Sequence, residues 1–417
     1  MGAERRRVFI TGIGVITPLG NSMPKLWAAV REGRSAIGRL TRFEAKSFRS
    51  QLAAEVLDFD VSEYVDGRQA RRLDRFSALA VAAATLAVRD AAIPSHASCL
   101  CHGGVAVGSA LGGVAFAEEQ HARFEQAGLR AVEPHLALTM FGGAGASNVA
   151  IALGMRGPTL GNADSCASGI VAIGEAFRLI QRGDIDVALA GGAEAPLAPL
   201  TFGAFSIIHA MSAHNQQPAL ACRPFDAARD GFVMAEGAAL FVLESEQRAR
   251  ARSAQAYLEI AGYGLSNDAW HMAAPRPDGA EAARAMRLAL ADAGLRTEQI
   301  GYVNAHATGT QLGDQAEALA IRSALPETWR VTPVSSTKPL HGHALGATGA
   351  IELAITAKAL QEGWLPPTIN LTQPGSDCEL AHVPVDGMAT AAEAAICNAF
   401  GFGGINACLV VRRPEIT

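Results

Sequence analysis

Short apolar runs rich in β-branched residues alternate with longer Ala- and Leu-rich segments along this chain. The strand-like runs include residues 105–108, 186–190 and 238–244, and helical patterns cover residues 72–90 and 170–182. Strands buried on both faces read as continuous apolar runs, and their alternation with helices is typical of α/β proteins. The pattern therefore predicts an α/β fold with buried strands. No Pro-, Ser- or Gly-rich linker interrupts it, so we expect one compact unit.

The composition supports a large core and bounds the partners. Of the 417 residues, 49% are hydrophobic and 18% are charged, and the net charge is -5. This balance excludes a disordered chain and gives no overall basic field for nucleic acid. The apolar run at residues 76–88 is shorter than the roughly 18 residues that a membrane span needs. With no apolar leader and seven cysteines, an odd number, we expect a cytoplasmic protein without a disulfide framework.

A weak internal repeat divides the chain. Residues 8–14 and residues 257–264 both read as a strand that runs into a spaced glycine pair, and residues 8–10 predict a strand that the first pair ends. A strand, a turn with reactive side chains and an Ala-rich helix also occur once in each part. These matches predict a duplicated α/β unit whose halves are residues 1–255 and 256–417. Chance resemblance between common strand-glycine patterns is the alternative.

Cys166 is the first residue with a setting suited to chemistry. Small residues flank it on both sides, and the apolar residues 170–173 predict that a helix follows. The amides and partial positive charge of a helix N-terminus favour a thiolate and can hold an oxyanion. The pattern thus predicts a nucleophile, with a buried structural cysteine as the alternative.

His306 lies at the end of an apolar run, in a loop of small and hydroxyl residues. Thr308 and Thr310 offer donors and acceptors to an amide-bearing ligand, while Asp314 and Glu317 stand one helical turn apart and are suited to orienting the loop. A capped helix start with a satisfied histidine is the alternative to a substrate site.

Lys338, His341 and His343 form a third cluster, between a strand-like run and a Gly- and Ala-rich helical segment. Two histidines separated by one residue sometimes bind zinc. No cysteine or acidic residue is near in the sequence, and Lys338 opposes a cation, so we expect no metal. Glu352, further along the helix, is the expected carboxylate partner of Lys338.

Two glycine-rich segments and one basic cluster complete the motifs. Residues 12–17 have two of the three glycines of a dinucleotide fingerprint, and Pro18 stands where the helix should continue, so a nucleotide site is not expected. Residues 398–406 lie between two short strands, and their phenylalanines form either an apolar gate or plain core. Four arginines cluster at a helix start, where they either dock an acidic partner or are simply solvated: Arg68, Arg71, Arg72 and Arg75.

The order of these motifs resembles one known family. A cysteine before a helix, then His306, Lys338 and His343, and a terminal Gly-Phe-Gly-Gly loop at residues 401–404 resemble the β-ketoacyl-acyl-carrier-protein synthases, specifically the synthase II type of thiolase-fold condensing enzymes. The resemblance covers essentially the whole chain and includes the segment at residues 223–237. It implies a thiolase-like duplicated fold with α/β/α/β/α layers and two pseudo-symmetric halves.

The resemblance implies a decarboxylative Claisen condensation in fatty-acid or type II polyketide or polyene biosynthesis, catalysed by an acyltransferase. Cys166 would take the acyl chain from a carrier-protein thioester, and neutral His306 and His343 would stabilise the enolate formed from malonyl-acyl-carrier protein. The backbone N–H groups of Cys166 and Phe402 would form the oxyanion hole, and Lys338 paired with Glu352 would hold the histidine geometry. The resemblance also implies substrate binding by Thr308, Thr310, Phe402 and Leu111.

The resemblance further implies that acyl carrier protein docks on Arg68, Arg71 and Arg72. Substrates would arrive on its 4'-phosphopantetheine, with no metal, nucleotide or flavin cofactor, and the chain would form a homodimer. Three alternatives stay open: a subunit active only as a heterodimer with a chain-length-factor-like partner, a partner without activity, which Cys166 argues against, and a non-condensing cysteine acyltransferase or hydrolase. The chain departs from the family pattern at Asp164, Ser165, His214, His341 and Ile405.

Overall fold

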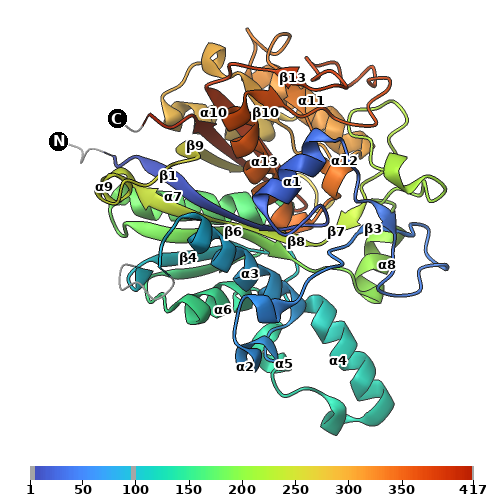
Figure 1. Cartoon of the computed structure of the whole chain (residues 1–417). Coiled ribbons are helices and arrows are strands. Elements are labelled where there is room, and N and C mark those ends of the chain that lie inside the picture. Colours follow the sequence, from blue (N-terminus) through green and yellow to red (C-terminus); the bar gives the residue numbers. More distant parts are fainter. Residues whose placement is uncertain (1–4, 95–99, 416–417) are drawn as a thin grey trace.

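The computed structural model describes residues 5–94 and 100–415. Within them, ten strands form one long mixed sheet (Figure 1), in the order β11-β10-β14-β15-β9-β1-β8-β6-β4-β5. These strands are β1 (Val8–Ile16), β4 (Gly104–Gly108), β5 (Thr159–Asn162), β6 (Val187–Glu194), β8 (Gly237–Ser245), β9 (Leu258–Asn267), β10 (Tyr302–Asn304), β11 (Val334–Ser335), β14 (Ala394–Gly401) and β15 (Ile405–Arg412). Smaller sheets contain β2 (Gly38–Arg39), β3 (Leu52–Ala54) and β7 (Met234–Ala235), and β12 (Trp364–Leu365) and β13 (Met388–Ala389).

The strand order confirms the duplication. Numbered within each half, the strands lie in the order 1-5-4-2-3: β1-β8-β6-β4-β5 in the first half and β9-β15-β14-β10-β11 in the second. The pairing directions also agree. In each half, the fifth strand is antiparallel to both the first and the fourth, whereas the second strand is parallel to both the fourth and the third. Antiparallel pairing of β1 with β9 joins the halves. The boundary after residue 255, between α9 (Glu246–Ala251) and β9, stays a prediction.

Helices form three layers around the two half-sheets (Figure 1). α3 and α6 cover the outer face of the first half, α10 and α11 cover that of the second, and α7 and α13 lie between the halves. The predicted α/β/α/β/α layering is therefore present. These helices are α3 (Arg75–Asp90), α6 (Ala144–Leu153), α7 (Ser168–Arg182), α10 (Ala280–Ala293), α11 (Gln311–Ala324) and α13 (Thr348–Glu362).

The apolar runs of the strands have two buried faces. In β8, Phe241 and Leu243 pack against the middle helices, whereas Leu240 and Val242 pack against the outer ones. Side chains alternate along a strand, so a strand between two helical layers must be apolar at every position. This requirement explains the continuous apolar runs in the sequence.

The first strand is longer than predicted. It continues through the glycine pair to the end of β1, so the expectation that Gly12 and Gly14 end it at residue 10 is wrong. A Cβ at either glycine, or at Gly262 or Gly264 in β9, would lie only 1.9–2.3 Å from a helix carbonyl oxygen. The glycines therefore allow α3 and α10 to lie directly on the strands, which is a packing role.

The remaining helices surround this core. The predicted helix at 72–90 begins three residues later, at Arg75, after the N-cap Asp74. In Figure 1, α4 and α5 project from the lower end of the molecule, beside α2. No helix in the described segments is both long and apolar enough to cross a membrane. These other helices are α1 (Met23–Arg31), α2 (Gly67–Ala70), α4 (Val114–Ala127), α5 (Leu136–Thr139), α8 (Pro199–Ile207) and α12 (Lys338–His341).

Candidate active site

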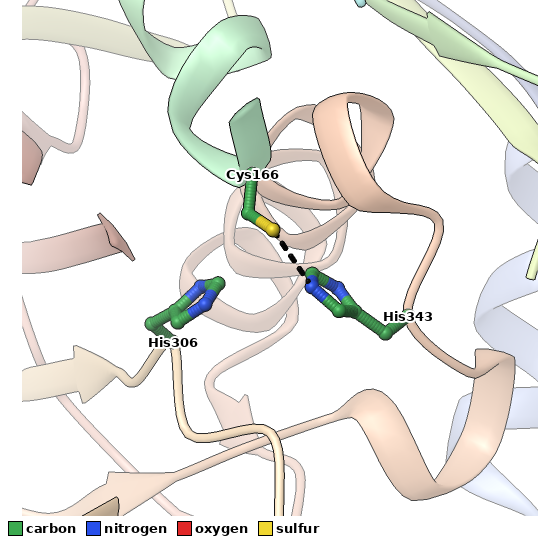
Figure 2. Close-up of side chains that lie close together, drawn as sticks. All are labelled: Cys166, His306 and His343. Carbon is green, nitrogen blue, oxygen red and sulfur yellow. Dashed lines mark hydrogen bonds between the residues drawn. The ribbon is translucent and has the colours of Figure 1, made fainter. Parts of the chain in front are cut away.

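Three predicted side chains from distant parts of the sequence meet in one cavity. Figure 2 shows the rings of His306 and His343 on either side of the Cys166 sulfur. His343 Nε2 lies 3.1 Å from Cys166 Sγ, and the sulfur and one nitrogen of each ring all lie within 4.8 Å of one another. The cavity holds about 490 Å³, and Thr308 and Phe402 also line it. The structure thus brings the separate motifs into a single site.

Cys166 lies in a tight turn between β5 and α7. The turn is a single 3₁₀ segment, Ser165–Ala167, in which Ser165 has a left-handed φ of 53°. The thiol is 7% exposed, and burial raises its pKa to about 11, while Ser165 and Lys338 act in the opposite direction. The sequence predicted a thiolate favoured by the helix; burial works against that form, so a nearby hydrogen-bond donor is needed to stabilise the charge.

The backbone of His306, rather than its imidazole ring, makes the hydrogen bonds that hold this residue in place. Glu317 accepts hydrogen bonds from the amides of His306 (2.9 Å) and Ala307 (2.6 Å), and Asn398 donates to the same carboxylate (3.0 Å). Burial, together with the charge of Lys338, holds the pKa of His306 well below its usual value. The ring is therefore neutral at neutral pH and faces the cavity.

Asp314 shapes the threonine part of the loop. Its carboxylate accepts hydrogen bonds from the amides of Thr308 (3.0 Å) and Gly309 (3.1 Å). The hydroxyls of Thr308 and Thr310 lie 3.1 Å apart, and both residues line the cavity. The predicted orienting role of Asp314 and Glu317 is therefore confirmed by their contacts.

His343 precedes a turn like that of Cys166, formed by the 3₁₀ segment Leu345–Ala347 before α13. Its Nδ1 lies 3.0 Å from Thr348 Oγ1, and its Nε2 faces the cysteine. Burial and the charge of Lys338 lower its pKa well below the usual value. A Thr348 hydroxyl that donates to Nδ1 would leave the ring proton on Nε2, from which it would be donated into the cavity.

Lys338 forms the predicted ion pair with Glu352. Its Nζ lies 2.6 Å from the carboxylate, and both side chains are buried. Burial raises the pKa of Glu352 to about 7, and the lysine charge acts in the opposite direction. Removal of one member of such a buried pair typically costs about 3–5 kcal/mol. Each charge therefore depends on its partner, and Lys338 acts to lower the pKa of both histidines.

His341 and His343, the two histidines of the predicted third cluster, make different hydrogen bonds. His341 Nε2 lies 3.0 Å from Thr337 Oγ1, whereas both ring nitrogens of His343 are engaged by Thr348 and Cys166. The spacing of Cys166, His306 and His343 would fit an ion, but the charge of Lys338 opposes a cation there. The absence of a metal stays a prediction.

The other predicted binding residues are divided between the cavity and the surface. The backbone amide of Phe402 acts to lower the pKa of the Cys166 thiol, against the larger effect of burial. Phe402 also lines the cavity, with its ring centroid 6.1 Å from that of Phe205. Leu111 packs into an apolar cluster that also contains Cys166. Of the four clustered arginines, Arg75 is bound to the buried Glu236 (2.6 Å), and three are exposed: Arg68, Arg71 and Arg72.

Sequence reasoning missed three residues that contact this site. Thr348 is hydrogen-bonded to the His343 ring, and Asn398 donates to Glu317. Glu194 accepts hydrogen bonds from the backbone amides of Ala110, after β4, and of Gly346, in the turn after His343. A signal existed for Glu194, since it is the one acidic residue at the end of an otherwise apolar run, at residues 187–194. Thr348 and Asn398 lie in glycine-rich segments that the sequence analysis singled out, but no pattern marks either residue itself. Cys99 lies outside the described residues, and four of the other cysteines are buried without a disulfide: Cys222, Cys378, Cys397 and Cys408.

Comparisons with known proteins agree with this geometry. The family model "Beta-ketoacyl synthase, N-terminal domain" matches residues 5–249, and "Beta-ketoacyl synthase, C-terminal domain" matches residues 257–372. A 3-oxoacyl-[acyl-carrier-protein] synthase 2 from a Synechocystis strain is 40% identical over 412 residues, 99% of either chain. The structure titled the ishigamide ketosynthase/chain length factor is 33% identical, with a TM-score of 0.91 over 99% of this chain and 100% of that one. A type II PKS acyl-carrier protein in complex with its ketosynthase bound to the hexaketide includes a chain that is 31% identical, with a TM-score of 0.90 over 98% and 100%.

Proposed function

This chain belongs to the beta-ketoacyl synthase family, and from this membership we propose the reaction that it catalyses. An acyl group held on Cys166 condenses with malonyl-acyl-carrier protein, carbon dioxide leaves, and 3-oxoacyl-acyl-carrier protein is formed. The reaction serves fatty-acid or type II polyketide or polyene biosynthesis. The similarity to ketosynthase structures also confirms the thiolase-like fold. The observation that carries the proposal is the convergence of Cys166 with two neutral histidines in one cavity.

In the first half-reaction, Cys166 attacks the thioester of an acyl-carrier protein. The Cys166–acyl bond forms, the bond to the phosphopantetheine sulfur breaks, and the cysteine proton ends on the departing thiol. His343 Nε2, 3.1 Å away, donates toward the sulfur and offsets part of the cost of a buried thiolate. The amides of Cys166 and Phe402 are proposed to receive the oxyanion.

In the second half-reaction, the malonyl thioester replaces the released carrier arm. Its carboxylate leaves as carbon dioxide, and the electron pair of that bond forms an enolate. The neutral rings of His306 and His343, both buried in the lining of the cavity, donate hydrogen bonds to the enolate oxygen. The enolate carbon then attacks the acyl carbonyl carbon, and the Cys166 sulfur leaves. The Lys338–Glu352 pair keeps the rings in place.

The proposal for substrate binding uses three residues that line the cavity and one, Leu111, from the apolar cluster beside Cys166. Thr308 and Thr310 are proposed to bind the amides of the phosphopantetheine arm, Phe402 to gate the cysteine, and Leu111 to limit the acyl pocket. The exposed side chains of three arginines support docking of an acidic carrier protein: Arg68, Arg71 and Arg72. No resident cofactor is needed for this chemistry. A homodimer and a cytoplasmic location are also part of the proposal.

The second candidate function is a ketosynthase subunit that works only beside a chain-length-factor-like partner. Its support is the similarity to the solved structure of the ishigamide ketosynthase/chain length factor. An assay separates the two candidates: malonyl-carrier protein and a panel of acyl-carrier proteins are supplied, and carbon dioxide and product mass are followed. Product from the purified chain alone supports the first function, product only after addition of such a partner supports the second, and no product in either case contradicts both.

A further inference from the structure

Glu194 is a buried carboxylate for which the reaction above has no role. It ends β6 and is 0% exposed. Its oxygens accept hydrogen bonds from Ser109 Oγ (2.8 Å), Ala110 N (2.6 Å), Leu111 N (3.2 Å) and Gly346 N (3.0 Å). None of these partners is a cation, unlike those of several other buried glutamates. Burial raises the pKa of Glu194 to about 7, and the four converging donors act in the opposite direction, because they favour an ionised carboxylate.

The four donors come from two segments with different tasks. Ser109, Ala110 and Leu111 form the loop after β4, which contains the proposed acyl-pocket residue. Gly346 lies three residues after His343, in the turn that begins α13. One carboxylate therefore ties the acyl-pocket loop to the turn beside His343.

We propose that Glu194 is a positioning residue that holds the Leu111 loop and the His343 turn in register. This inference rests on the proposed function. Because its hydrogen bonds span both segments, Glu194 sets the depth of the acyl pocket and the position of His343 together. Its removal should therefore change the preference for acyl-chain length as well as the rate of decarboxylation.

The duplication supports this assignment. Glu194 ends β6 and Gly401 ends β14, and these are the fourth strands of their respective halves. The Glu194 carboxylate lies 3.0 Å from the amide of Gly346, and a Cβ at Gly401 would lie 3.1 Å from the amide of Cys166. At the Gly346 turn of the second half, the carboxylate of Glu194 from the first half thus fills the kind of position that Gly401 leaves open beside the nucleophile.

The test compares Glu194→Gln with Glu244→Gln. Glu244 is also 0% exposed and also lies in the first half-sheet, but it binds Arg248 and Arg252 away from the cavity. For each protein, kcat/KM is measured with a short and a long acyl-carrier protein, together with the decarboxylation of malonyl-carrier protein and the melting temperature. We expect Glu194→Gln to change the ratio of kcat/KM for the short substrate to kcat/KM for the long one, and to slow decarboxylation at least 10-fold. Glu244→Gln should keep the wild-type ratio.

A second variant keeps the test decisive if Glu194→Gln does not fold. Ser109→Ala leaves the carboxylate but removes the hydrogen bond to Glu194 and the one that Ser109 Oγ accepts from Gly112 N (2.9 Å). Loss of the bond to Glu194 should shift the same ratio in the same direction by about 2- to 10-fold, the effect of one hydrogen bond. Equal ratios in wild type, Ser109→Ala and any folded Glu194→Gln would overturn the inference. An inactive wild type would instead contradict the proposed function, so the two failures are distinguishable.

Discussion

The turn at Cys166 and the turn at Gly346 follow the same backbone path in the two halves of the molecule. The residues before them, Asp164 and Ala344, have φ and ψ of −85° and 39° and of −84° and 38°. The next residues, Ser165 and Leu345, both have left-handed φ, of 53° and 41°. Each turn then enters a 15-residue helix that lies between the half-sheets.

The two turns differ in what surrounds their central residue. Cys166 directs its side chain into the cavity, whereas a Cβ at Gly346 would lie 2.4 Å from the amide nitrogen of Ala110. The amide of Gly346 is bound by Glu194, and Gly401 leaves the corresponding space beside Cys166 open. A strand-turn-helix geometry is therefore not sufficient for a nucleophile. The neighbouring strand end must also leave room for a substrate oxygen.

Cys166→Gly makes the first turn chemically like the second and should have the largest effect. Condensation should fall at least about 1,000-fold, because the acyl group then has no covalent acceptor. Unfolding free energy should change by no more than about 1–3 kcal/mol. Product mass spectrometry and thermal melting measure the two quantities. Condensation retained by this variant would rule out Cys166 as the nucleophile.

Gly401→Asp places a carboxylate beside the cysteine amide, as in the other half. The variant should lose about 100-fold in the rate of Cys166 acylation, the typical effect of disabling one oxyanion donor. Gly401→Ala is the matched control, since it adds the same Cβ, 3.0–3.1 Å from its neighbours, without the charge. Intact-mass kinetics of acyl transfer measure both. Equal losses in Asp and Ala variants would show that crowding, not charge, is responsible.

Gly346→Ala tests the packed turn. The added methyl group should destabilise the fold by about 1–3 kcal/mol, because it meets the backbone of the Leu111 loop rather than a cavity. Gly142→Ala is the control, since a Cβ there meets nothing within 4 Å. Denaturant unfolding compares the two variants. A Gly346→Ala protein as stable as the control would contradict the close contact.

His341→Thr should have the smallest effect, visible only in the pH dependence of stability. Burial lowers the pKa of His341 to about 3 from the ordinary 6.5, so the folded protein binds fewer protons than the unfolded chain between these values. Stability from this group is therefore present above pH 6.5 and falls as pH decreases, by at most about 1.4 kcal/mol per pH unit. The variant should show a shallower acid decline in melting temperature. Wild type and the His341→Thr variant both retain His306 and His343. Identical slopes of melting temperature against pH in the two proteins would therefore exclude a contribution from His341.

The sequence by itself determined the parts that local pattern encodes. Strand and helix periodicity predicted the α/β fold, the glycine pairs of β1 and β9 indicated the duplication, and the order of Cys166, His306, Lys338 and His343 identified the reactive segments. These signals are readable because neighbouring residues decide periodicity and turn formation. The end of β1 was misjudged, because a glycine that serves packing looks in sequence like a glycine that ends a strand.

The tertiary structure alone decided which groups meet and which are charged. Cys166 and His343 are 177 residues apart and lie 3.1 Å from each other, and the direction of every shifted pKa in the site follows from burial. It also separated Arg75, bound to Glu236, from its exposed neighbours, and it joined Glu194 to two turns. Contacts between segments remote in the sequence set these distances and this burial, and therefore no local pattern in the sequence contains them.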